Sequence, residues 1–204
     1  MNKITIRKGI IKNIQYSHSI NDVEYDKADL LVKRKDGKED LINIRFKKFS
    51  NKYNENDEID LVGNIRSYSK QGENGKNSVE LYVFTYFDLP EGVVEDNTTP
   101  TNVVEVDGRI CKKDILRTTQ SGKHNIHFIL ANNIITNETN QKLNSYLPVI
   151  AWGKIAKELA ELPISTKLSI TGELHSREYK KTLENGEIEI RVAREIVVTS
   201  YELC

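Results

Sequence analysis

Two short stripes of alternating cationic and aromatic residues are the part of this sequence that could do chemistry. One stripe holds His175, Arg177 and Tyr179, and the other holds Arg66, Tyr68 and Lys70. Alternate residues of an extended strand share one face, so each triplet would present its cations and its ring together. Rings stack on unpaired bases and cations neutralise phosphates, which is the combination that sequence-tolerant binding of a single strand requires.

Each stripe follows a glycine in a segment that occurs twice along the chain. Val62–Ser67 reads VGNIRS and Thr171–Ser176 reads TGELHS, and each leads through a glycine-containing turn into an alternating apolar strand. An earlier β-like segment is broken by Gly9 in one half and by Gly108 in the other. A period of roughly 100 residues exceeds the 20–50 of solenoid repeats and matches a small domain. The chain is therefore predicted to hold two related β-domains in tandem.

Composition excludes several classes of protein. The 204 residues carry no net charge, with +2 in residues 1–89, −3 in 90–102 and +1 in 103–204. Any anion-binding face must therefore come from local sorting of charge. No apolar run approaches the ~18 residues of a membrane span, and the N-terminus lacks a signal-peptide core. The two cysteines, Cys111 and Cys204, are too few for a disulfide framework or a zinc site, which predicts a cytoplasmic protein without a metal.

Nothing in the sequence favours an enzyme. It has no Walker loop, no nucleophile elbow and no cluster of metal ligands. The Gly-Lys pairs lack the surrounding phosphate-loop pattern, and paired acids lie mostly in turns. We therefore expect a non-catalytic protein without a cofactor.

The order of expected elements predicts the fold. In the second half three strands precede an amphipathic segment at 153–162, where Ile155, Leu159 and Leu162 recur at helical spacing before Pro163, and two strands follow. This β-β-β-α-β-β order is the plan of the OB-fold, a five-stranded Greek-key barrel. The first half has the same five strands, but its segment 50–57 lacks a helical face. We predict an all-β chain of two tandem OB-folds, 1–89 and 103–204, joined by a proline-containing linker at 90–102.

The second half resembles the bacterial single-stranded DNA-binding protein family, which includes the related primosomal protein of replication restart. The match runs in order through Val106–Ile110, Thr119–Lys123, Phe128–Asn132, Tyr146–Ala156 and Gly172–Tyr179. The resemblance implies non-catalytic binding of single-stranded DNA in replication, recombination or repair. It also implies a ring-like unit of four domains, which two of these chains could supply as a homodimer; a monomer is the alternative. The sequence ends at Ser200–Cys204 without the family's acidic tail, so we expect no recruitment of replication or recombination proteins by that route.

Strand parity and the resemblance together select a candidate binding face. Tyr146, Trp152 and Tyr179 match the family's base-stacking positions, and Tyr146 and Trp152 share one side of their strand with Pro148 and Ile150. The expected nucleic-acid-binding residues of the second domain are Tyr146, Trp152, His175, Arg177 and Tyr179, with Arg109, Lys112, Arg117 and Lys123 bordering the groove. Those of the first domain are Arg45, Lys47, Phe49, Arg66, Tyr68 and Lys70.

The two copies are expected to be unequal. Counting along the third strand, Phe49 matches Trp152, whereas Asn43 stands where the second domain has Tyr146. The first domain would then be the weaker or differently used copy.

Other readings stay open at this stage. Trp152 could cap a core, and Tyr146 and Tyr179 could be dimer contacts, since interfaces favour tyrosine. An OB-fold scaffold that docks replication or recombination proteins and binds DNA weakly is the alternative function. A binder of structured RNA or oligosaccharide would share the same fold.

Overall fold

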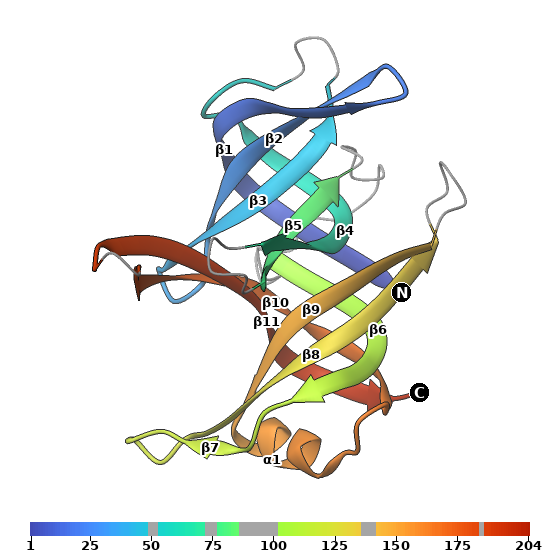
Figure 1. Ribbon diagram of the computed structural model, residues 1–204, viewed down its shortest axis with the longest axis vertical. Coiled ribbons are helices and arrows are strands. Elements are labelled where there is room, and N and C mark those ends of the chain that lie inside the picture. The colour runs from blue at the N-terminus through green and yellow to red at the C-terminus, as the bar shows by residue number, and fades with distance from the viewer. Residues whose placement is uncertain (49–52, 72–76, 86–101, 136–141, 184–185) are drawn as a thin grey trace.

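The chain forms two β-barrels stacked along its long axis (Figure 1). This computed structural model describes residues 1–48, 53–71, 77–85, 102–135, 142–183 and 186–204. The upper barrel is built from the first five strands, β1 (Asn2–Ile20), β2 (Val23–Lys33), β3 (Glu39–Lys47), β4 (Glu58–Gln71) and β5 (Asn77–Thr85). The lower barrel contains β6 (Asn102–Lys113), β7 (Arg117–Thr118), β8 (His124–Ile135), β9 (Lys142–Trp152), α1 (Gly153–Glu161), β10 (Lys167–Thr182) and β11 (Ile188–Leu203).

Each half closes on itself in the same order. In the first, β1 pairs with both β2 and β4, β2 pairs with β3, and β5 joins β4 to β3. In the second, β6 pairs with β8 and β10, and β11 joins β10 to β9. The closing pair is parallel in both halves, Ile44 to Val83 and Val149 to Ile196. This five-stranded Greek-key closure is the OB-fold, so the predicted fold class of two tandem OB-folds is confirmed.

Alternation of apolar and polar residues decides which face of each strand enters a core. In β9, Leu147, Val149 and Ala151 are buried in the core cluster, while Tyr146 and Trp152 point to the opposite face. In β3, Ile42, Ile44 and Phe46 are buried in the same way, which leaves the odd-numbered residues for the outer face.

The expected helix is present as α1 and covers the end of the second barrel. Its buried residues are Ala156 and Leu159. Lys113 donates from Nζ to the carbonyl oxygens of Ala160 and Leu162, where the last turn of a helix carries partial negative charge. In the first domain the described residues 53–57 form a turn and no helix, as expected. No helix among the described residues is long and apolar enough to cross a membrane.

The repeated glycines stand where the backbone of a neighbouring strand comes too close for a side chain. A Cβ atom on Gly63 would lie 2.5 Å from the carbonyl oxygen of Phe84, and one on Gly172 would lie 2.4 Å from that of Val197. Both distances are far shorter than carbon and oxygen tolerate. The glycine of the VGN and TGE segments is therefore required by the packing of β4 on β5 and of β10 on β11.

The two barrels share one continuous sheet. Strand β1 pairs with β6 in an antiparallel register in which Ile4 faces Val104, Asn2 faces Val106 and Ile6 faces Asn102. Ile4 pairs with Gly63 as Val104 pairs with Gly172, so Ile4 and Val104 are equivalent residues that face each other, which defines a pseudo-twofold axis between the domains. Most of the expected linker, 90–102, lies outside the described residues; the boundary at 89 remains a prediction, and Asn102 belongs to β6.

Two buried asparagines repeat the same symmetry. Asn2 exchanges two hydrogen bonds with the backbone of Ile65, at 2.8 Å each, and Asn102 exchanges two with the backbone of Leu174, at 2.5 and 3.1 Å. Asn2 also donates to Oδ1 of Asn132, which ties the first domain to the second. Because the amides are satisfied, their burial is not penalised.

The last hairpin of each barrel contacts the other barrel through its first strand. The hydroxyl oxygen of Ser67, on β4, accepts a hydrogen bond from the backbone N–H of Tyr146 at 2.7 Å. The hydroxyl oxygen of Ser176, on β10, accepts one from the backbone N–H of Leu41 at 2.8 Å. Figure 1 shows the long β10–β11 hairpin projecting beside the lower edge of the first barrel. The domains are therefore held by reciprocal contacts as well as by the shared sheet.

A buried ion pair lies in this interface. The carboxylate of Asp40 is fully buried, 3.2 Å from Nε of Arg34, and accepts the backbone N–H of Ser176 at 2.6 Å. Nη1 of Arg34 also forms a hydrogen bond with Nδ1 of His175 at 3.2 Å. In the first domain, Asp40 therefore binds the backbone of the second domain and Arg34 binds its imidazole.

Candidate nucleic-acid interface

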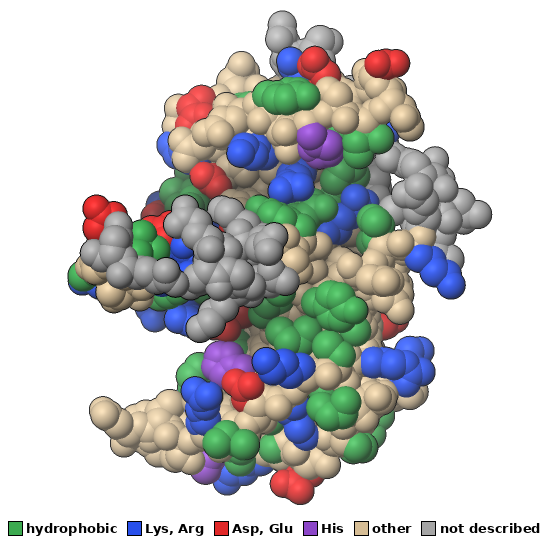
Figure 2. Space-filling model, in the orientation of Figure 1, with side chains coloured by type: hydrophobic (Ala, Val, Ile, Leu, Met, Phe, Trp, Pro, Cys, Tyr) green, Lys and Arg blue, Asp and Glu red, His purple; other side chains and the backbone are tan. Residues whose placement is uncertain are grey.

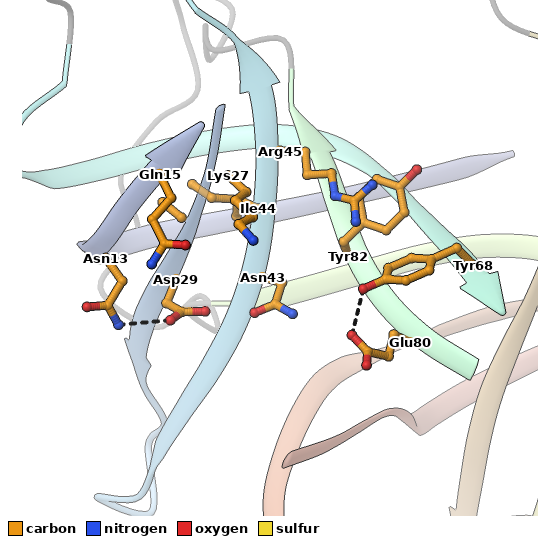
Figure 3. A pocket seen from close by; sticks show the side chains of 11 residues that line it. Asn13, Gln15, Lys27, Asp29, Asn43, Ile44, Arg45, Tyr68, Glu80 and Tyr82 are labelled. Carbon is orange, nitrogen blue, oxygen red and sulfur yellow. Dashed lines mark hydrogen bonds between the residues drawn. The ribbon is translucent and has the colours of Figure 1, made fainter. Parts of the chain in front are cut away.

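The outer face of the first barrel carries an arginine stacked on two tyrosines. The guanidinium carbon of Arg45, on β3, lies 4.1 Å from the ring centre of Tyr82 and 4.8 Å from that of Tyr68. The two rings are 5.9 Å apart. Figure 3 shows the three side chains together at one end of a groove. Both the rings and the flat guanidinium offer surfaces on which a base can stack.

Glu80 fixes the orientation of one of these rings. The hydroxyl of Tyr68 donates to Oε2 of Glu80 at 2.7 Å. Burial raises the pKa of Tyr68, and the hydrogen bond to the Glu80 carboxylate adds to the rise. Tyr68 therefore stays a neutral phenol, which adds no negative charge to the face.

A second aromatic cluster continues the same face. The guanidinium of Arg66 lies 3.9 Å from the ring centre of Phe84, and the Phe84 ring is 6.0 Å from that of Tyr25. Tyr25 stacks on His18 at 4.9 Å, with the ring planes 7° apart. Burial lowers the pKa of His18, and the nearby Arg45 lowers it further. Arg66, Phe84, Tyr25 and His18 therefore form one continuous series of ring contacts.

The first-domain groove contains polar side chains as well as rings. Its volume is about 320 Å³, near the lower end of the range typical of small-ligand pockets. Tyr68, Tyr82 and Arg45 form one end, and Asn13, Asp29 and Asn43 cross the other (Figure 3). A groove of this kind can stack one base and hydrogen-bond another.

A larger groove of about 520 Å³ runs between the domains. The β10–β11 hairpin contributes Arg177, Tyr179 and Arg191, and β9 contributes Pro148. Asp29 and Glu80 line this groove and the first-domain groove alike, so the two are contiguous.

Arg194 anchors the wall between the domains. Its Nε donates to the carbonyl oxygen of Leu41 at 2.7 Å, and its Nη2 donates to Oδ1 of Asn43 at 2.9 Å. Burial lowers the pKa of Arg194, while the charges of Asp29 and Glu80 oppose that change. The guanidinium keeps its charge because the pKa of an arginine starts far above neutrality.

The second domain places its expected aromatic residues at separate points. Tyr146 is 49 % exposed beside Ser67 of the first barrel. Trp152 is half-buried at the start of α1, and Nζ of Lys123 lies 5.1 Å from its ring centre. Tyr179 lies on the inter-domain groove with Arg177, whose Nε is 3.5 Å from Glu195. The structure therefore places Lys123 over the ring of Trp152, and it places Arg177 and Tyr179 separately along the inter-domain groove.

Other expected site residues are engaged elsewhere. His175 lies in the domain interface, where it contacts Arg34 and where its Nε2 is 2.9 Å from Glu173. Arg109 donates to the carbonyl oxygen of Ser165, and Arg117 lies 3.7 Å from Asp114. Four expected residues remain. Lys112 is exposed on β6, Lys47 pairs across the strands with Tyr25, and Phe49 and the side chain of Lys70 lie outside the described residues.

The expected correspondence between the third strands is wrong by two residues. The parallel pairs match Ile44 with Val149, so Leu41, not Asn43, corresponds to Tyr146, and Lys47, not Phe49, corresponds to Trp152. The reciprocal hydrogen bonds of Leu41 and Tyr146 agree with this match. A shift of two keeps the same face of the strand, so Arg45 and Lys47 still point outward as expected.

The outer face of the first domain carries its aromatic residues at other positions. Tyr68 and Tyr82 line the groove, whereas Tyr25 and Phe84 are each only 7 % exposed. That the first domain is the weaker or differently used copy stays a prediction. Tyr82 and Phe84 were missed although they alternate with the buried Leu81 and Val83, and that alternation was the signal that could have found them.

On the face shown in Figure 2, lysine and arginine side chains are interspersed with hydrophobic ones over both barrels. Ile150, which shares one side of its strand with Tyr146 and Trp152, is only 4 % exposed.

The fold places the chain in the class of tandem OB-fold proteins. Residues 101–203 match the model of the single-strand binding protein family, which is half of the chain. The chain belongs to that family. The single-stranded DNA-binding protein 1 of Streptococcus pyogenes is 31 % identical over 104 residues, which are 50 % of this chain and 76 % of that protein.

Solved structures extend the likeness to both domains. The wild-type single-stranded DNA binding protein from Thermus aquaticus covers 100 % of this chain and 93 % of its own, with a TM-score of 0.69 and 17 % identity. A deletion mutant of the same protein gives a TM-score of 0.70 at 16 % identity, over 100 % of this chain and 94 % of that one. At these identities the likeness concerns the fold, here of the whole tandem chain.

Proposed function

We propose that this protein binds single-stranded DNA, without catalysis and with little sequence preference over most of the bound strand. The observation that carries the proposal is that arginines and rings line one contiguous groove. Arg45 lies over Tyr68 and Tyr82 in the first domain, and Arg177 and Tyr179 both line the inter-domain groove. Rings accept any base, and cations follow the phosphates, so neither feature selects a sequence.

The remaining functional assignments are part of the same proposal. Family membership supports a role in replication, recombination or repair, in the cytoplasm, as a monomer or a homodimer. We assign contacts with DNA to the outward cations and rings. In the second domain these are Tyr146, Trp152, Arg177, Tyr179 and Lys123, and in the first they are Arg45, Lys47, Arg66 and Tyr68.

A comparison of single-stranded and duplex DNA tests this function. We expect oligo-dT to bind at least about tenfold more tightly than duplex of equal length, because paired bases cannot stack on protein rings. Affinity should fall as salt rises, since each neutralised phosphate releases a counterion. Fluorescence anisotropy of labelled oligonucleotides gives both results, and quenching of Trp152, the single tryptophan, reports the second domain separately.

The opposite outcome is equally clear. Equal affinity for duplex and single strand would contradict the proposal. Absence of binding to oligo-dT at moderate salt would favour the alternative, a scaffold that docks replication or recombination proteins.

A further inference from the structure

We propose that the polar end of the first-domain groove is a guanine-binding pocket, in which the carboxylate of Asp29 accepts hydrogen bonds from N1–H and N2–H of one base. The inference deepens the function proposed above and rests on it. It adds one position at which the bound strand is read by its base edge.

The geometry places an acceptor and a donor side by side. Asp29 on β2 and Asn43 on β3 are direct cross-strand partners, so their side chains leave the sheet together on its outer face. Nδ2 of Asn13 donates to Oδ2 of Asp29 at 3.0 Å, which is the one hydrogen bond to this carboxylate among the described residues. Oδ1 of Asn43 accepts a hydrogen bond from Arg194, which leaves the Nδ2 group of Asn43 as a donor for a ligand. Figure 3 shows Asn13, Asp29 and Asn43 in succession along the groove.

A carboxylate is out of place in a groove that serves only to hold a polyanion. It repels phosphate and weakens the attraction of Lys27, Arg45 and Arg194 for the strand. Its presence is accounted for if it faces a base and not the backbone. Ionised acceptors make the stronger hydrogen bonds to base N–H groups, and phosphates have no N–H to offer.

The donor pattern of the bases selects guanine. An ionised carboxylate accepts through both oxygens and donates nothing. Guanine presents two adjacent donors, N1–H and N2–H, on its Watson–Crick edge, with O6 next to them for the amide of Asn43. Thymine offers one donor between two acceptors, and cytosine and adenine each set a ring-nitrogen lone pair beside their amino group. Guanine is therefore the base that satisfies both carboxylate oxygens without repulsion.

The rest of the groove supplies the neighbouring contacts. Tyr68, Tyr82 and Arg45 line the same groove and can stack an adjacent base while the edge of the guanine reaches Asp29. Reading one edge beside a stacked base is a common way of recognising an unpaired nucleotide.

Alternating oligonucleotides test the pocket in the full-length protein. Labelled strands of about 15 nucleotides, near the upper end of the site size of an OB-fold, are made as oligo-dT, alternating dT-dG and alternating dT-dI. Inosine lacks the N2 amino group and so loses one of the two donors. We expect the wild-type protein to prefer dT-dG over oligo-dT by at least about fivefold, as a bidentate contact allows, with dT-dI between them.

Asp29→Asn is the decisive variant, with Asp26→Asn as its control. Asp26 lies on the same strand but on the opposite face, so its replacement removes an equal charge away from the groove. Asp29→Asn should abolish the preference for guanine while oligo-dT binding stays equal or tightens, and Asp26→Asn should leave the preference intact. Equal binding of all three strands by the wild-type protein would contradict the guanine pocket. The same holds if Asp29→Asn tightens the binding of all three strands by the same factor, because the preference for guanine would then be unchanged. Failure to bind any of them would refute the proposed function instead.

Discussion

Asp40→Asn should lower the free energy of unfolding by about 3 kcal/mol, at the lower end of the cost of breaking a buried ion pair. Asparagine keeps the shape of the side chain and an oxygen for the backbone N–H of Ser176, but it removes the charge 3.2 Å from Nε of Arg34. The side chain of Arg34 is 17 % exposed, so water only partly replaces the lost partner. Urea denaturation followed by circular dichroism measures the loss.

Asp36→Asn is a matched control for this effect. Asp36 lies 3.8 Å from the same Nε atom, yet its side chain is 52 % exposed. Exposed ion pairs contribute about 0–1 kcal/mol to stability, so the free energy of unfolding of this variant should lie within roughly 1 kcal/mol of the wild-type value. Equal effects of the two substitutions would show that burial of Asp40 in the domain interface does not govern the stability.

The fold could be predicted because its signals are local and repeated. Gly63 and Gly172 mark positions where a side chain would strike the backbone of the adjacent strand, and their neighbours repeat in the same order. The single change of period at 153–162 placed the helix, where Ala156 and Leu159 are buried. Barrel order then followed from the order of elements.

The pairing of the two domains could not be predicted in the same way. Nothing in the pattern of Asn2–Ile6 shows that its edge pairs with Asn102–Val106, since both read as ordinary strands. The bonds of Asp40 and Arg34 to the second domain likewise join residues more than 130 positions apart. Long-range contacts of this kind carry no periodic signal.

The sequence predicted which strand face the candidate site residues occupy, but not which residues of the two domains correspond. Parity put Arg45, Tyr68, Arg177 and Tyr179 on the outer face, and the structure has them there. Counting along the third strand failed by two residues because the connections between strands differ in length in the two halves. The equivalent of Ala28 is Phe128, whereas the equivalent of Ile44 is Val149. Register set by hydrogen bonds, and not by sequence distance, fixes which residues correspond.

Removing both tyrosines of the first-domain groove should have the largest effect on DNA binding. Each of Tyr68→Ala and Tyr82→Ala should weaken oligo-dT binding by about 1–3 kcal/mol, the range for a lost base stack. The double variant should lose roughly 2–5 kcal/mol, with some departure from additivity because the rings are 5.9 Å apart and share Arg45. Anisotropy titration with labelled oligo-dT measures the losses.

Two further variants separate stacking from other causes of this loss. Tyr82→Phe keeps the ring and should keep the affinity, because a stacking platform needs the π-face and not the hydroxyl. Tyr16→Ala removes a tyrosine that is 57 % exposed on β1 and does not line either groove, so binding should not change. Thermal melting of each variant checks that the barrel stays folded, since Tyr82 is half-buried. Oligo-dT affinity that survives the double substitution in a folded protein would move the binding face away from the first-domain groove, to the surface around Trp152 and Lys123.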